Sequence, residues 1–361
     1  MEKLIHIVEP TLEGESGHCR SLIESFGRAG AGTAHRLLVW GGKNAGRPDC
    51  PGTAIGVERY FSRRIRRLQS FLLYRRLLAR PGRIFLPTAG RTDLLLFHLA
   101  SRGPIPPGKV FLFFHWFRVS PKRLHFLRKM AGSQPHVTIV GSTPSVAAPF
   151  RECGFANVAV APIPVAGSGS DPSTGPVPFS RLLYAGAARQ DKGFPRVVDL
   201  IALLAARKDD LPVNVQVSPD HYEKLDPATK SDIERLRAIR YPGLGIVEHA
   251  LGQEEYRRLF EGAVCLQPYD RDEFADRVSG VTLDALTAAS PVVATSGTWI
   301  ARLVERFGAG KAVEDPTPDR LLAAVSEVVA DYARYRENAA EAGRVIREEN
   351  SARHLFSVVT A

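Results

Sequence analysis

Short apolar runs alternate along the chain with longer segments in which apolar residues recur every three or four positions. Lys3–Val8 predicts a buried strand, and the helix predicted over Cys19–Ala29 has Leu22, Ile23 and Phe26 on one face. Further strands are expected at Ala34–Trp40, Arg83–Pro87, Lys109–His115, His136–Val140, Arg181–Ala185, Val213–Val217, Ala263–Pro268, Pro291–Thr295 and Lys311–Glu314. In the second half these strands are interleaved with helices at Phe194–Ala206, at Thr282–Ala289 and from Asp319.

This alternation is typical of parallel, doubly wound α/β sheets. It predicts two Rossmann-like domains that face each other across a cleft. Because ligands bind beyond the carboxyl ends of such strands, the loops that follow strands are the segments to search for chemistry.

A linker and a change of charge predict where the chain divides. Pro162–Pro178 is rich in Gly, Pro and Ser and has no apolar period. Residues 1–170 carry 24 Lys and Arg against 9 Asp and Glu, whereas residues 171–361 carry 24 against 29. We expect one domain over 1–165, a second domain over 178–344, and a terminal helix at about 345–361.

Length and composition narrow the protein class. A chain of 361 residues with 44% hydrophobic and 24% charged residues is globular and long enough for two domains. Its apolar runs are too short to span a bilayer, and its start does not resemble a signal peptide. The scattered Cys19, Cys50, Cys153 and Cys265 suggest neither a zinc site nor a disulfide framework. We therefore expect a cytoplasmic protein.

The loop and helix at Tyr269–Pro291 form the sharpest candidate site. Ser279 and Gly280 open a helix whose first turn presents free N–H groups, an arrangement suited to a diphosphate. Asp284, one turn into the helix, could accept hydrogen bonds from ribose hydroxyls. The other interpretation is that Asp276 and Asp284 are a solvated surface pair.

A second candidate loop, Ala185–Phe194, directly follows a predicted strand. Arg189 and Lys192 lie three positions apart in it and could reach one anionic group. A solvated turn that carries two basic residues is the alternative.

The order of these motifs resembles the retaining GT-B glycosyltransferases, in a family 4-like pattern of two acids separated by seven residues. Asp276 and Asp284 hold that spacing, with Gly280 at the mid-motif glycine. Lys192-Gly193 and the strand Pro291–Thr295 match the neighbouring parts of the pattern, and the resemblance covers roughly residues 180–315. Both acids are Asp where the family has Glu, Ala187 stands where an Arg is frequent, and Ser290 replaces a Gly.

The resemblance implies a role for each matching position. Arg189 and Lys192 would hold the donor diphosphate and stabilise the leaving group. The N–H groups of Val281 and Thr282 would cap the same phosphates, Asp284 would bind the ribose, and Asp276 would contact the donor sugar. The remaining candidates are Gly186 and Ser279 beside the phosphates, Gly17 in the loop Gly14–His18 that would close over the donor or the acceptor, and His115 at a strand end in the first domain.

These roles define a glycosyltransferase that retains anomeric configuration and uses a UDP- or GDP-linked sugar as donor. The resemblance also implies that the domain over 1–165 binds the acceptor and that the domain over 178–344 binds the nucleotide sugar. It implies further that the helix at about 345–361 crosses back to the first domain. The acceptor would be a glycan or a lipid-linked glycan. Neither a cofactor nor a metal is expected, because basic side chains and the helix start would do the work of a divalent cation. His115 has a second interpretation as a core histidine at a strand end.

The segment Arg59–Arg80 contains eight arginines and no acid. Read as a helix, it has an apolar stripe formed by Phe61, Ile65, Leu68 and Leu72, with arginines pointing away. A core helix with a basic outer face is one interpretation, and attachment to an anionic membrane surface on the inner face is the other. Nucleic acid is not expected as a partner, because no aromatic stacking platform accompanies the arginines.

Two other functions remain open. A non-catalytic module that binds a nucleotide or an anionic glycan is compatible with Asp at both motif positions. A nicotinamide-dependent dehydrogenase is disfavoured because no G-x-G-x-x-G turn follows the first strand.

Overall fold

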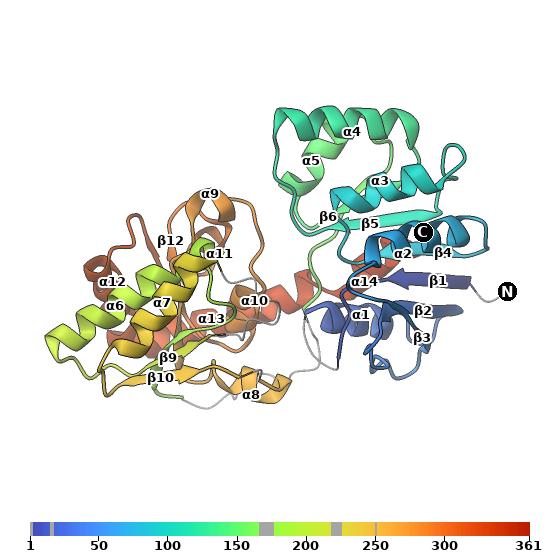
Figure 1. Ribbon diagram of the computed structural model, residues 1–361. Helices are drawn as coiled ribbons and strands as arrows, with labels where there is room; N and C mark the ends of the chain where they lie inside the picture. Colours follow the sequence, from blue (N-terminus) through green and yellow to red (C-terminus); the bar gives the residue numbers. More distant parts are fainter. Residues whose placement is uncertain (1–2, 15–17, 166–176, 218–225, 250) are drawn as a thin grey trace. The chain divides into compact units, whose positions relative to one another are not determined.

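The computed structural model describes residues 3–14, 18–165, 177–217, 226–249 and 251–361. The chain divides into two compact units, of which unit 1 is Met1–Ser168 with Glu349–Ala361 and unit 2 is Gly169–Glu348 (Figure 1). Gly17 and most of the predicted linker Pro162–Pro178 lie outside the described residues.

Unit 1 is built on a parallel sheet of seven strands in the order β3-β2-β1-β4-β5-β6-β7. The strands are β1 (Lys3–Val8), β2 (His35–Gly42), β3 (Ala54–Phe61), β4 (Arg83–Leu86), β5 (Val110–Phe114), β6 (Thr138–Gly141) and β7 (Val158–Val160). The helices are α1 (His18–Ala29), α2 (Arg66–Leu78), α3 (Arg91–Ala100), α4 (Pro121–Ser133), α5 (Pro144–Glu152) and α14 (Ala352–Thr360). All five residues of β5 are buried, as expected of a central strand covered by helices on both faces.

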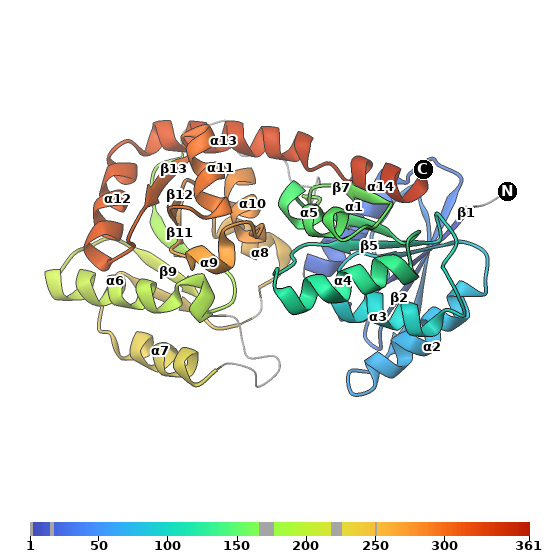
Figure 2. The same cartoon turned by 90° about the horizontal axis from the view of Figure 1, so that it is seen from above.

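Helix α14, which follows unit 2 in sequence, packs in unit 1 against α1. Phe356 of α14 contacts Phe26 of α1, with the ring centroids 5.1 Å apart. The Arg83 guanidinium donates hydrogen bonds to the carbonyls of Val359 and Ala361 at the end of the same helix. Helices α1 and α14 cover one face of the sheet, and α2, α3 and α4 lie side by side on the other (Figure 2).

Unit 2 repeats the architecture with six parallel strands in the order β10-β9-β8-β11-β12-β13. The strands are β8 (Arg181–Tyr184), β9 (Val213–Gln216), β10 (Leu244–Val247), β11 (Ala263–Gln267), β12 (Val292–Thr295) and β13 (Gly310–Val313). A short 3-10 turn, η1 (Gln190–Lys192), directly precedes the first helix. The helices are α6 (Phe194–Arg207), α7 (Pro227–Ala238), α8 (Gln253–Arg258), α9 (Arg271–Phe274), α10 (Gly280–Thr287), α11 (Trp299–Phe307), α12 (Pro318–Ala330) and α13 (Tyr332–Glu349).

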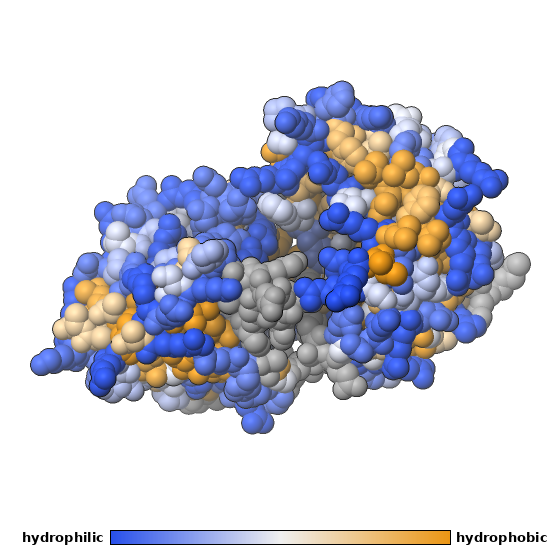
Figure 3. Space-filling view, in the orientation of Figure 1, coloured by the Kyte–Doolittle hydropathy of each residue, from blue (hydrophilic) through white to orange (hydrophobic). Residues whose placement is uncertain are grey.

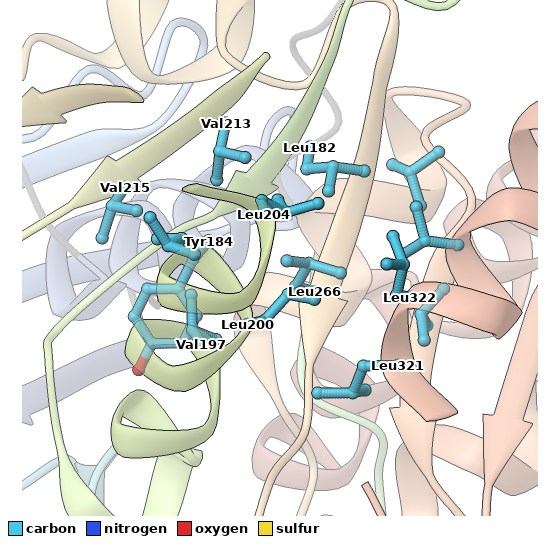
Figure 4. Packing of buried hydrophobic residues seen from close by; sticks show 14 of the residues in the cluster. Leu182, Tyr184, Val197, Leu200, Leu204, Val213, Val215, Leu266, Leu321 and Leu322 are labelled. Atoms are coloured by element: carbon cyan, nitrogen blue, oxygen red, sulfur yellow. The ribbon is translucent and has the colours of Figure 1, made fainter. Parts of the chain in front are cut away.

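The core of unit 2 lies between β8, β9 and β11 on one side and α6 and α12 on the other. Leu200 and Leu204 of α6 are fully buried against Leu182 and Leu266 of the sheet and Leu321 of α12 (Figure 4). Helices α10, α11 and α13 cover the opposite face of the sheet (Figure 2). None of the described helices combines the length and the apolar character that crossing a bilayer requires.

Three strands that the apolar pattern did not predict, β3, β7 and β10, all lie at a sheet edge. An edge strand pairs on one side only, and the side chains of β7 and β10 are only partly buried. Their sequences therefore lack the continuous apolar run by which the central strands were recognised.

The single helix predicted over Arg59–Arg80 is wrong at its start, and the interpretation that its apolar stripe faces the core is wrong as well. Phe61 ends strand β3, and α2 begins only at Arg66. Ile65, Leu68 and Leu72, which the core-helix interpretation would bury, are 52%, 59% and 49% exposed. The buried residues of α2 are Ser70, Leu73, Tyr74 and Leu77, and the Tyr74 ring stacks on Phe97 of α3 at 3.9 Å. Two apolar stripes compete on this helix, and packing against α3 selects the one that carries the aromatic ring.

The orientation of α2 predicts opposite effects for two adjacent leucines. Leu73→Ala removes a fully buried side chain and should lower the free energy of unfolding by about 2–5 kcal/mol. Leu72→Ala should change it by less than about 0.5 kcal/mol, because the side chain faces solvent. Urea unfolding followed by circular dichroism measures both, and a larger loss for Leu72→Ala would show that the helix is rotated.

Candidate functional site

The two loops that the sequence singled out leave the same edge of the unit 2 sheet. Strands β8 and β11 are parallel neighbours, so the segments after Tyr184 and after Gln267 both begin at their carboxyl ends. The Asp270 N–H donates to the Asp191 carbonyl at 2.9 Å. Gly193, at φ +65°, lies so close to Pro268 that an added Cβ would fall 1.9 Å from the Pro268 carbonyl oxygen. Only glycine permits this approach of the two backbones.

Gly186, Lys192 and Val281 meet where the first loop faces the start of α10. Gly186 has φ +95°, and a Cβ added there would lie 3.3 Å from Lys192 Nζ and 3.2 Å from Val281 Cγ2. Its N–H donates to Gln216 Oε1 at 2.7 Å, which fixes the loop to the end of β9. The structure thus brings the predicted residues Gly186, Lys192 and Val281 together.

Three cationic side chains gather around Asp191. Arg189 forms an ion pair with the Asp191 carboxylate, and Arg277 Nη1 lies 3.3 Å from the same oxygen. Burial and the neighbouring charge of Arg189 lower the pKa of Lys192 to about 8. Burial and Arg189 likewise lower the pKa of Arg277. Asp191 forms ion pairs with both arginines, and three basic groups grouped in this way are suited to an anion.

Helix α10 begins at the predicted place, with Ser279 as its N-cap. The Ser279 hydroxyl accepts from the Thr282 N–H at 3.3 Å. The Thr282 N–H, which was predicted to bind phosphate, therefore already has a protein partner. No protein acceptor for the Gly280 or Val281 N–H is found in the described part of the chain. A Cβ added at Gly280 would meet no atom within 4 Å, which leaves open space before the first turn. Gly280 and Val281 are therefore the donors that the helix start offers to an anion.

Asp284 is an enclosed carboxylate on the same helix. Tyr256 of α8 donates a hydrogen bond to Asp284 Oδ2 at 3.1 Å. Burial raises the pKa of Asp284 to about 6, against the effects of Tyr256 and Lys192, which lower it. The interpretation of Asp284 as a solvated surface acid does not agree with this environment.

The environment of Asp276 differs from that of Asp284. Its side chain is 61% exposed and forms an ion pair with Arg302 of α11 at 3.0 Å. The two motif acids therefore occupy different environments, one solvated and one enclosed.

His115 lies in unit 1, directly after β5. Its carbonyl accepts from the Ser142 hydroxyl at 2.8 Å, and its ring packs edge-on against Phe113 at 4.7 Å. The residue as a whole is partly exposed, but its ring Nε2 is buried, at the carboxyl edge of the unit 1 sheet.

The residue pattern did not identify Arg277, Asp191 or Tyr256. Arg277 directly follows the motif acid Asp276, and Asp191 lies between the two predicted basic residues, so both were inside the quoted loops. Tyr256 is 28 positions from Asp284, and nothing in the sequence connects the two.

The fold is shared with several solved structures, although no protein-family model and no curated protein matches the sequence. Sucrose-phosphate synthase from Thermosynechococcus elongatus is similar with a TM-score of 0.71 at 14% identity, over 99% of this chain and 98% of that one. The Anabaena protein HepE in complex with UDP-glucose is similar with a TM-score of 0.64 at 14% identity, over 99% and 98%. WaaG, a glycosyltransferase involved in lipopolysaccharide biosynthesis, gives 0.66 at 14% identity, over 99% and 100%. The chain has the GT-B fold. The alternation of strands and helices in the sequence predicted two parallel-sheet α/β units, and that prediction is confirmed.

The raised pKa of Asp284 predicts a pH-dependent stability. The unfolded carboxyl ionises near pH 4 and the folded one near pH 6, so the folded state loses relative stability as the pH rises between these values. Above pH 6 the loss is about 3 kcal/mol. Asp284→Asn should therefore be more stable than the wild type at pH 7.5, by up to that amount, and this advantage should vanish near pH 4.

Thermal and urea unfolding at the two pH values measure this difference. Asp276→Asn is the matched control, because its exposed side chain should shift stability by less than about 0.5 kcal/mol at either pH. An Asp284→Asn advantage that is equal at pH 4 and pH 7.5 would contradict the enclosed carboxylate.

Proposed function

We propose that the protein is a glycosyltransferase that transfers a sugar from a UDP- or GDP-linked donor to an acceptor with retention of configuration. One observation carries the proposal: three cationic groups and an open helix start converge at the carboxyl ends of β8 and β11 in a GT-B fold. Strand ends of a doubly wound sheet are where such a fold binds its nucleotide.

The cation cluster would hold the donor diphosphate. Lys192 and Val281 lie beside Gly186, and the space next to Gly280 at the helix start is open. Arg189 and Arg277 supply two further charges, which Asp191 holds in place. When the bond between the sugar and the diphosphate breaks, negative charge grows on the leaving phosphate, and fixed cations stabilise that state. We propose that these groups supply the neutralisation without a divalent metal.

Asp284 would bind the donor ribose through its carboxylate oxygens. Tyr256 already occupies Oδ2 at 3.1 Å, so the hydrogen bond fixes the carboxylate while its remaining lone pairs accept from hydroxyls. An ionisable acid at this position lowers the free energy of unfolding above pH 6. Such a cost in stability is expected of a residue that is kept for ligand binding.

Asp276 and His115 would act on the donor sugar, in the family 4-like pattern of two acids separated by seven residues. This part of the proposal rests on the spacing in the sequence and on the position of His115 at a strand end. Asp276 would exchange its exposed ion pair with Arg302 for the sugar hydroxyls at little cost, because exposed pairs contribute only about 0–1 kcal/mol.

The similar structures support the choice of substrates. HepE is described in complex with UDP-glucose, and WaaG is described as involved in lipopolysaccharide biosynthesis. We propose a nucleotide-sugar donor and a glycan or lipid-linked glycan acceptor for this chain as well. All four cysteines are free, which fits the proposed location in the cytoplasm.

Nucleotide binding should raise the melting temperature. UDP or GDP at a hundredfold excess over its Kd should stabilise unit 2 by about 2.7 kcal/mol, a rise of roughly 5 °C or more, whereas NAD should have no effect. Lys192→Ala should remove most of the rise because it deletes the enclosed ammonium group, and Lys192→Arg should retain much of it. Differential scanning fluorimetry gives the measurement.

Lys230→Ala is the matched control, because Lys230 is an exposed lysine on α7 of the same unit. It should leave the nucleotide shift unchanged. A full shift in Lys192→Ala would mean that the diphosphate binds elsewhere.

Turnover distinguishes the enzyme from a non-catalytic nucleotide-binding module. A screen of UDP- and GDP-sugars should find one donor whose hydrolysis or transfer first yields the donor's own anomer, as read by proton NMR. The rate should persist in excess EDTA if the cations do the work of a metal. Nucleotide binding without turnover of any donor would favour the binding module, and loss of activity in EDTA that Mg²⁺ or Mn²⁺ restores would refute metal independence.

A further inference from the structure

The outward surface of α2 and α3 is unusually apolar. In the described residues, every large hydrophobic side chain recorded as exposed lies in unit 1, between Ile65 and Val119. Five of these seven side chains belong to α2, its N-cap or α3: Ile65, Leu68, Leu72, Leu95 and Leu99. Figure 3 shows an apolar area on unit 1 over the region that α2 and α3 occupy in Figure 1. We call these five side chains the α2–α3 face.

Helical geometry makes the face continuous. Leu68 and Leu72 are one turn apart on α2, and Leu95 and Leu99 are one turn apart on α3. The two helices contact each other through their opposite, buried sides, where Tyr74 stacks on Phe97. The exposed leucines are therefore not part of the core of unit 1. Exposed apolar groups that gather on one surface commonly mark a place of association.

The charge around the face is of one sign. Residues 59–129 contain 17 Lys and Arg and a single acid, Asp93. The Asp93 carboxylate accepts hydrogen bonds from the Tyr74 hydroxyl at 2.8 Å and from the Gly90 N–H at 2.9 Å, so it is engaged within the helix pair. Arg75 and Arg76, both exposed, flank the outward stripe of α2 on its two sides.

We propose that the α2–α3 face docks on an anionic lipid bilayer, with the leucines entering the interface and the arginines contacting lipid phosphates. Apolar side chains at the centre with arginines at the border are what a charged bilayer surface accommodates. A second copy of the chain would bring like charges together, and a nucleic acid would offer no hydrocarbon to the leucines. This inference is independent of the proposed sugar transfer.

Co-sedimentation of the full chain with vesicles tests the proposal. Vesicles of phosphatidylcholine with 30% phosphatidylglycerol should bind the protein at least tenfold more tightly than vesicles of phosphatidylcholine alone, and 0.5 M NaCl should weaken this binding severalfold. Leu68→Gln with Leu72→Gln should weaken it at least tenfold. The melting temperature of this double variant should stay within a few degrees of the wild type, because both side chains face outward.

A pair of charge variants separates local docking from net charge. Arg75→Gln with Arg76→Gln should weaken binding about threefold to tenfold. Arg320→Gln with Arg334→Gln removes the same charge from exposed positions of unit 2 and should change binding by less than twofold.

Three results would overturn the proposal: no vesicle binding, equal binding to both kinds of vesicle, or equal losses for the two arginine pairs. A lipid-free dimer that the leucine double variant converts to a monomer would also overturn it, because the face would then join two copies of the chain. Light scattering without lipid detects that outcome.

Discussion

The close approach of two backbones at Gly193 and Pro268 is the constraint on which the candidate site of unit 2 depends. Side chains on different loops hold a common geometry only if the loops themselves are fixed. Here the parallel pairing of β8 with β11 sets their starting points, and the hydrogen bond from Asp270 to Asp191 ties them further along. Asp191 can then hold Arg189 from its own loop and Arg277 from the other.

The site holds charges that the protein alone does not stabilise well. Lys192 has a lowered pKa because it is enclosed beside another cation, and Asp284 has a raised pKa because it is enclosed with one tyrosine as its hydrogen-bond partner. Each shift disfavours the ionised form of its group. A ligand that carries negative charge toward Lys192 and hydroxyls toward Asp284 would favour both ionised forms, so binding and ionisation would assist each other. This coupling explains why such groups cluster at functional sites.

The central strands and the start of α10 could be predicted from the sequence because their signals are local. Val110–Phe114 is a continuous apolar run, and Ser279-Gly280 is a recognisable helix start. The orientation of α2 could not be predicted, because two apolar stripes share that helix and only the packing of Tyr74 on Phe97 decides between them. The edge strands β3, β7 and β10 were not predicted for a similar reason, since each pairs on one side only, whereas the edge strand β13 was predicted.

The candidate site shows the same division between local and distant information. The spacing of Asp276 and Asp284 is visible in the sequence, but their contrasting environments depend on Arg302 and Tyr256, which lie far away along the chain. Arg277 is adjacent to a motif residue, but the sequence did not identify it as part of the site. An arginine that belongs to a site and a solvated arginine look the same in a charged loop until the partner is known.

The position of α14 has a consequence for the order in which the chain can assemble. Unit 1 draws residues from both sides of unit 2, and the α1 face of its sheet is covered only once Phe356 reaches Phe26. During synthesis, the residues of unit 2 are made between the two segments of unit 1 that must meet. The earlier-synthesised part of unit 1 must therefore wait for α14, with the apolar surface around Phe26 uncovered. Chaperone access to α1 during that interval would then govern how much of the protein matures correctly.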